Sequence, residues 1–71
     1  MEIKQLITYW NKRYTYITEE LNNLAKIYEE RHSEFTLEES EVHRSMTDRY
    51  NNQLKMVQAT VEALEGLNEH T

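Results

Sequence analysis

A regular stripe of apolar residues runs through the first half of this 71-residue chain. Successive members are alternately four and three residues apart, and only the Arg31 position is polar: Ile3, Ile7, Trp10, Tyr14, Ile17, Leu21, Leu24, Tyr28, Arg31 and Phe35. This spacing places every member on one side of an α-helix, where a neighbouring helix of a coiled coil would cover it. We therefore predict a helix over about residues 2–33.

A short β-hairpin is the competing interpretation of the N-terminal segment. Residues 6–10 and 13–17 are rich in β-forming side chains. However, the two residues between them, Asn11 and Lys12, lack the glycine that two-residue hairpin loops favour. An isolated two-stranded hairpin is also unstable in water, and the heptad spacing continues through the segment without slipping. The pattern favours the helix.

A second helix start follows at Thr36 and Glu39, which have the spacing of a capping box. Acidic residues in the first turn also suit the positive end of a helix dipole. If one long helix continued through this point, Glu38 and Arg49 would fall in the apolar stripe. The sequence therefore predicts a reversal of the chain near residues 33–36.

The second helix is predicted over about residues 37–65, with an apolar stripe of its own. The members of this stripe are Val42, Met46, Tyr50, Leu54, Val57, Val61 and Leu64. Gly66 lies where a left-handed C-cap would end the helix, with Leu67 folding back onto Val61.

Composition supports an all-α fold, because one glycine and no proline leave few means of making tight turns. Without cysteine there is no disulfide or thiolate metal site to stabilise a small fold. We predict an antiparallel two-helix hairpin, with residues 1–66 as a single domain and residues 67–71 as a short tail. Each stripe stays partly exposed in a lone hairpin, so we expect two copies to dimerise into a four-helix bundle.

The charge distribution argues against broad binding of nucleic acid. The net charge is −5, with +2 over residues 1–18 and −7 over residues 19–71. No stretch has the length and apolarity of a membrane span or signal peptide, so we expect a soluble, cytoplasmic protein. Asn, Lys, Ile and Tyr total 19 residues, a bias typical of AT-rich genomes and consistent with a phage or mobile-element origin.

Metal binding and catalysis are not expected. Glu29 and His32 have a spacing found in di-iron bundles, but the second such motif is missing, because Ser40 stands three residues before His43. A thin hairpin also offers no concave site where a base, its orienting group and an oxyanion donor converge. We expect no metal, no cofactor and no enzymatic activity.

On the first predicted helix, a second apolar strip lies about a quarter turn or more from the main stripe. On the second predicted helix, a matching strip occurs only in the last turns, roughly opposite or beside the main stripe. In a hairpin, the strips from both helices fall at the end away from the turn. Their aromatic side chains are of the kind that is enriched in binding hot spots. The candidate partner-binding residues are Leu6, Tyr9, Lys12, Arg13, Tyr16, Met56, Ala59, Ala63 and Leu67. The same strips also suit a homodimer interface, or the wider apolar stripe of a bundle helix.

These patterns favour a small protein-binding regulator, adaptor or inhibitor without enzymatic activity. The alternative is a nucleic-acid-binding hairpin dimer, because residues 9–16 mix aromatic and basic side chains as single-strand binders do.

Overall fold

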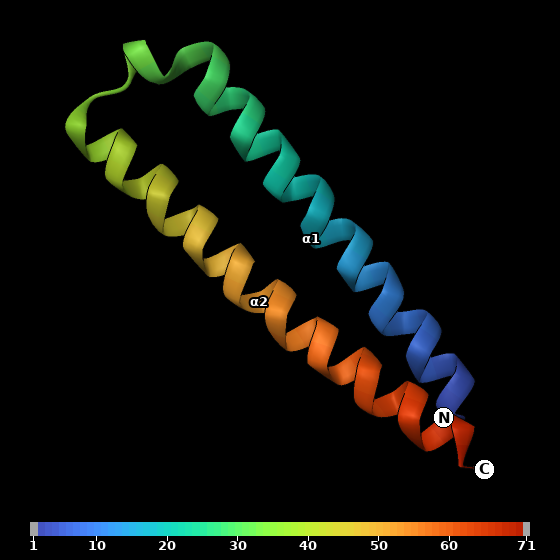
Figure 1. The fold of residues 1–71 in the computed structure, drawn as a ribbon. Coiled ribbons are helices and arrows are strands. Elements are labelled where there is room, and N and C mark those ends of the chain that lie inside the picture. The colour runs from blue at the N-terminus through green and yellow to red at the C-terminus, as the bar shows by residue number, and fades with distance from the viewer. Residues whose placement is uncertain (1, 71) are drawn as a thin grey trace.

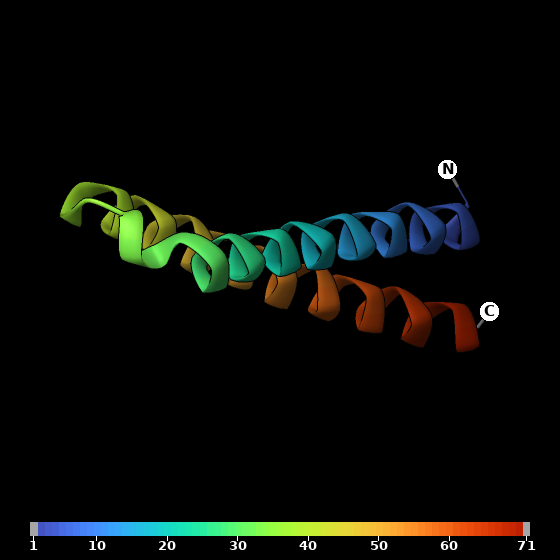
Figure 2. The same ribbon diagram turned by 90° about the horizontal axis from the view of Figure 1, so that it is seen from above.

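The computed structural model describes residues 2–70, which form two long antiparallel helices. Helix α1 spans Ile3–Arg31, a 3-10 turn η1 spans His32–Glu34, and helix α2 spans Leu37–Glu69. Figure 1 shows the helices side by side, with both chain ends at the end away from the turn, and Figure 2 shows their axes crossing at a shallow angle. Residues 2–70 contain no strand, so the helix is confirmed and the β-hairpin over residues 6–17 is wrong.

The predicted capping box begins α2 as expected. The backbone N–H of Glu39 donates to Oγ1 of Thr36 at 3.1 Å, and the N–H of Thr36 donates to Oε1 of Glu39 at 3.2 Å. Two of the backbone donors left over at a helix start are thereby satisfied.

The predicted helix end at Gly66 is wrong, because α2 continues to Glu69. Gly66 has no positive φ, and Leu67 is 57% exposed and does not fold back onto Val61. A glycine permits a left-handed C-cap without requiring one. Its cost inside a helix is only about 1 kcal/mol relative to alanine, and helix-compatible residues follow it.

The apolar stripe of α1 faces α2, as predicted. Ile17 is fully buried and Leu24 is 9% exposed, while Val57 on α2 is 5% exposed. These are the only buried side chains among residues 2–70. Two helices that meet along one line therefore enclose a very thin core.

The stripe of α2 is correct from Tyr50 onward and wrong at Val42 and Met46, which are 59% and 40% exposed. His43 and Thr47 lie partly buried in their place. Four residues turn a helix about 40° beyond a full turn, so the three successive four-residue steps of the predicted stripe drift away from α1. The half nearer the turn therefore packs polar side chains between the helices.

An aromatic cluster closes the turn end of the hairpin. The Tyr28 ring stacks on His32 at 4.8 Å between centroids and lies 5.3 Å from the His43 ring, which is itself 5.8 Å from Phe35. The cluster joins residues from α1, η1 and α2, so it stabilises the reversal of the chain without glycine or proline.

Candidate protein-binding face

Each helix has a centre line of residues, seven apart, that point most directly at the other helix. The centre line of α1 contains Ile3, Trp10, Ile17 and Leu24, and that of α2 contains His43, Tyr50, Val57 and Leu64. Side chains one residue before or three residues after a centre-line residue lie on one flank of their helix. Because the helices are antiparallel, these two flanks open on the same side of the hairpin.

The side chains on this side are mainly apolar. Seven of the nine large hydrophobic residues that are exposed in residues 2–70 lie on it, and half-buried Leu6 and small Ala63 extend it. We call it the apolar face and define it by Leu6, Tyr9, Tyr16, Ile27, Val42, Met46, Met56, Ala63 and Leu67. An apolar surface of this extent, contributed by both helices, is typical of a protein-interaction site.

On the opposite side of the hairpin the outer rim is polar. The rim carries the residues that directly follow the centre lines, and only Ala25 among them is apolar: Lys4, Asn11, Thr18, Ala25, Arg44, Asn51, Gln58 and Glu65. Nearer the contact between the helices, the residues four after a centre-line residue are mostly apolar: half-buried Ile7, Tyr14, Leu21, Leu54 and Val61, and exposed Tyr28. Here Nε2 of Gln58 donates to the Tyr14 hydroxyl at 3.5 Å, which ties the helices together. The exposed large hydrophobic side chains are thus concentrated on one side of the hairpin.

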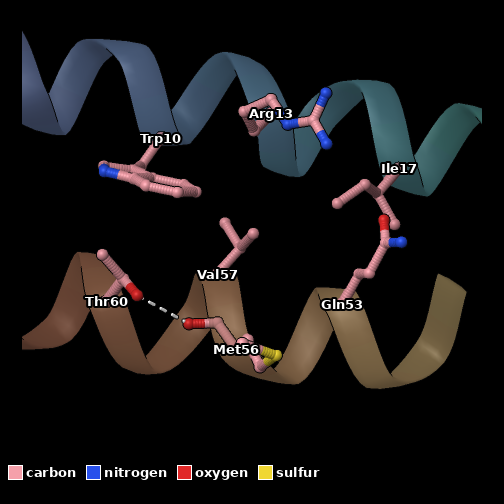
Figure 3. Close-up of a pocket in the computed structure, with 7 residues that line it drawn as sticks. All are labelled: Trp10, Arg13, Ile17, Gln53, Met56, Val57 and Thr60. Carbon is pink, nitrogen blue, oxygen red and sulfur yellow. Dashed lines mark hydrogen bonds between the residues drawn. The ribbon is translucent and has the colours of Figure 1, made fainter. Parts of the chain in front are cut away.

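A hollow of about 160 Å³ is sunk into the apolar face between the helices (Figure 3). Its floor is formed by the buried side chains of Ile17 and Val57, and Trp10 closes one end. Met56, which is 70% exposed, stands at its edge. The hollow therefore offers a partner an apolar floor beside an unbranched side chain of a type that adapts readily to a binding surface.

Aromatic contacts order the part of the face near the chain ends. Tyr9 and Trp10 pack edge to face, with ring centroids 5.2 Å apart. The guanidinium of Arg13 lies 5.7 Å from the centroid of the Tyr16 ring. Tyr9 and Tyr16 are nevertheless about half exposed, at 51% and 48%. They present ring surface that a partner could bury.

The structure brings together most of the residues singled out from the sequence. Leu6, Tyr9, Arg13 and Tyr16 of α1 share a side with Met56, Ala63 and Leu67 of α2. Lys12 and Ala59 instead lie on the outward sides of their helices, where both are exposed.

Sequence reasoning missed three members of the apolar face: Ile27, Val42 and Met46. Val42 and Met46 had been assigned to the contact between the helices. Ile27 follows Leu6 by three heptads, so the signal that could have found it was a second heptad row beside the main stripe.

Residues 2–70 hold no cluster of three or more His, Cys, Asp or Glu side chains that could bind a metal ion. Nδ1 of His32, part of the weak di-iron pattern, instead lies 2.7 Å from the Tyr28 carbonyl oxygen. Neither helix in the described part of the chain is long and apolar enough to span a membrane.

No protein-family model matches this chain, and comparison with curated proteins and with solved structures finds no match either.

Proposed function

We propose that this chain is a non-enzymatic protein-binding regulator, adaptor or inhibitor that acts in the cytoplasm through its apolar face. The observation that carries the proposal is the gathering of seven of the nine exposed large hydrophobic side chains on one side, while the outer rim of the other side is polar apart from Ala25. Solitary exposed hydrophobic residues are common on protein surfaces, whereas exposed hydrophobic residues gathered on one face mark an interaction site.

The composition of the face suits a protein partner. Tyrosine and methionine are enriched in protein interfaces, where tyrosine supplies large contact area from a side chain with few rotatable bonds. Tyr9, Tyr16 and Met56 are each about half exposed or more. They are the side chains we expect to contribute most to binding.

Binding of nucleic acid is the second candidate, supported by the basic and aromatic segment at residues 9–16. In the structure, Trp10 and Tyr14 pack partly buried between the helices, which leaves Tyr9, Lys12, Arg13 and Tyr16 as its exposed members. Lys12 points away from the apolar face, so Arg13 is the only basic group of this segment that lies beside the two tyrosine rings. With a net charge of −5, protein binding has the stronger support.

Site-specific photo-crosslinking in cells tests the proposal. A benzophenone amino acid replaces Met56 on the apolar face, and a control variant carries it in place of exposed Asn51 on the polar side. We expect the residue at position 56 to crosslink to another protein and the residue at position 51 to give no such product. Crosslinking to RNA or DNA from position 56 would support the alternative, and equal protein crosslinking from both positions would contradict the proposal.

A further inference from the structure

We propose that the apolar face is covered by a second copy of this chain, laid antiparallel so that the two α1 helices pack on each other. The inference rests on the proposed function in one respect: it takes the apolar face to be a protein-binding surface. Self-association and binding of a different protein would then compete for this face.

The first argument comes from one row of side chains on α1 that lie seven residues apart. In order, these are Leu6, Arg13, Glu20 and Ile27, each three residues after a centre-line residue. The row has an apolar residue at each end and opposite charges in the middle. The apolar residues of the row are therefore placed symmetrically about its midpoint, whereas the charges on the two sides of the midpoint are opposite.

A twofold axis through that midpoint, between residues 16 and 17, makes the row complementary to itself. Two antiparallel copies place Leu6 against Ile27 of the second copy, and Arg13 against Glu20 of the second copy, each pair occurring twice. Exposed ion pairs contribute little affinity, but they select register and orientation in helix pairs. The row thus favours this pairing over one shifted along the helix.

Helix α2 fits the same axis. Ile17 and Gln53 line the same hollow, so the midpoint of the α1 row lies at about the level of Gln53. Residues of α2 on either side of Gln53 then meet each other across the axis. Val42 falls near Ala63 of the second copy, and Met46 falls near Thr60, which pairs larger side chains with smaller ones.

The parallel alternative uses only one of the two charges on this row. If the two turn ends lay together, α1 of one copy would cover α2 of the other. Glu20 would then face Arg49 of the second copy, whereas Arg13 would face Met56. The antiparallel arrangement is the one that pairs both Arg13 and Glu20.

The size of the face and the thin core also point to a second copy. The described chain extends over 53 × 16 × 15 Å, so a second copy of the same length laid along it would cover the apolar face from end to end. Among residues 2–70, only Ile17, Leu24 and Val57 are buried within one hairpin. A second hairpin on the apolar face would enclose the hollow and provide the larger core that so short a chain needs.

Charge reversal, read by light scattering during size-exclusion chromatography, tests the inference. We expect the unmodified chain to run at twice its mass of 8.6 kDa. Arg13→Glu and Glu20→Arg should each weaken self-association about tenfold, because each reversal places like charges opposite one another twice across the axis, and the double variant should restore self-association. The matched controls Lys12→Glu and Glu19→Arg make the same charge changes one residue away, on the outward side, and should leave the dimer intact.

Three outcomes would overturn the inference. The first is that the unmodified chain is monomeric at tens of micromolar. The second is that the charge reversals at Arg13 and Glu20 change self-association no more than the outward controls do. The third is that the double variant does not recover self-association. A monomer whose position 56 still crosslinks to another protein would overturn the second copy and leave the proposed function standing. A dimer that crosslinks only to its own second copy would support the inference and overturn the proposed function.

Single cysteines test the orientation, because the chain contains no cysteine of its own. Tyr16 lies next to the proposed axis, so Tyr16→Cys should form a disulfide-linked dimer under mild oxidation, while outward Lys12→Cys should not. If Tyr16→Cys fails to link although the chain is dimeric, the antiparallel arrangement is wrong.

Discussion

His43 on α2 lies within hydrogen-bonding distance of a backbone carbonyl of α1: its Nε2 donates to the Leu24 oxygen at 2.7 Å. The two residues are 19 positions apart, and the bond crosses the interface between the helices. Because His43 occupies the centre line, Val42 on one side of it is directed onto the apolar face. The hydrogen bond between His43 and Leu24 thus accompanies a rotation of α2 about its axis that leaves Val42 exposed.

Replacing His43 with alanine should lower the free energy of unfolding by about 1–3 kcal/mol, from one lost hydrogen bond and lost ring contacts. Thermal and urea unfolding followed by circular dichroism measure this. Ser45→Ala, at an exposed position two residues along, should stay within about 0.5 kcal/mol of the unmodified chain. Equal stability of the two variants would contradict an anchoring role for His43.

Changing both Leu21 and Leu24 to aspartate should unfold the chain, because it places two carboxylates on the side of α1 that packs against α2. The controls are Asn22→Asp and Asn23→Asp together, which add the same charge at exposed positions between them. Circular dichroism should show lost helicity in the leucine variant alone. Cooperative melting that persists in the leucine variant would refute the packing of α1 on α2.

Thr36→Ala should destabilise the hairpin by about 1 kcal/mol, the usual cost of removing an N-cap side chain. For a chain of this size the melting temperature would fall by roughly 4–8 °C. Ser33→Ala, in the same turn region, is the control and should melt like the unmodified chain. A Thr36 variant that also melts unchanged would show that the capping box does not contribute to stability.

Gly66→Ala should stabilise the chain by about 0.5–1 kcal/mol, because alanine is the better helix former where φ is negative. A Cβ at this position would meet no atom within 4 Å, so no clash opposes the gain. The melting temperature should rise and helical circular dichroism should be retained. Lower stability would instead indicate the left-handed cap that the sequence had suggested.

Tyr9→Ser combined with Tyr16→Ser should leave the fold intact and weaken association, because both rings are about half exposed on the apolar face. Circular dichroism checks the fold, and light scattering with crosslinking from position 56 checks association. Asn51→Ser on the polar side is the control. Unchanged mass and unchanged crosslinking in the tyrosine variant would remove these rings from the binding surface.

Local sequence signals predicted the helices and the start of α2 well. The spacing of apolar residues defined α1, and Thr36 with Glu39 marked the first turn of α2, because both signals depend on neighbours within a few residues. The helix end was less predictable. Gly66 can either stop a helix or continue one, and nothing in the residues around it decided between the two.

The candidate site was found only in part. Leu6, Tyr9 and Tyr16 were assigned to a surface strip from their angle on one helix. Val42 and Met46 were placed between the helices, because apolar side chains are expected to be buried. In the structure His43 takes that place, since a bond to the Leu24 carbonyl satisfies its polar ring.

The sequence by itself determined that the chain forms two helices joined near residue 35, since helix periodicity and capping are properties of short stretches of chain. Only the tertiary structure decided which side of α2 meets α1. That choice depends on contacts between residues such as Leu24 and His43, which no short stretch contains. By setting the rotation of α2 about its axis, these contacts also brought two separate apolar strips onto one face.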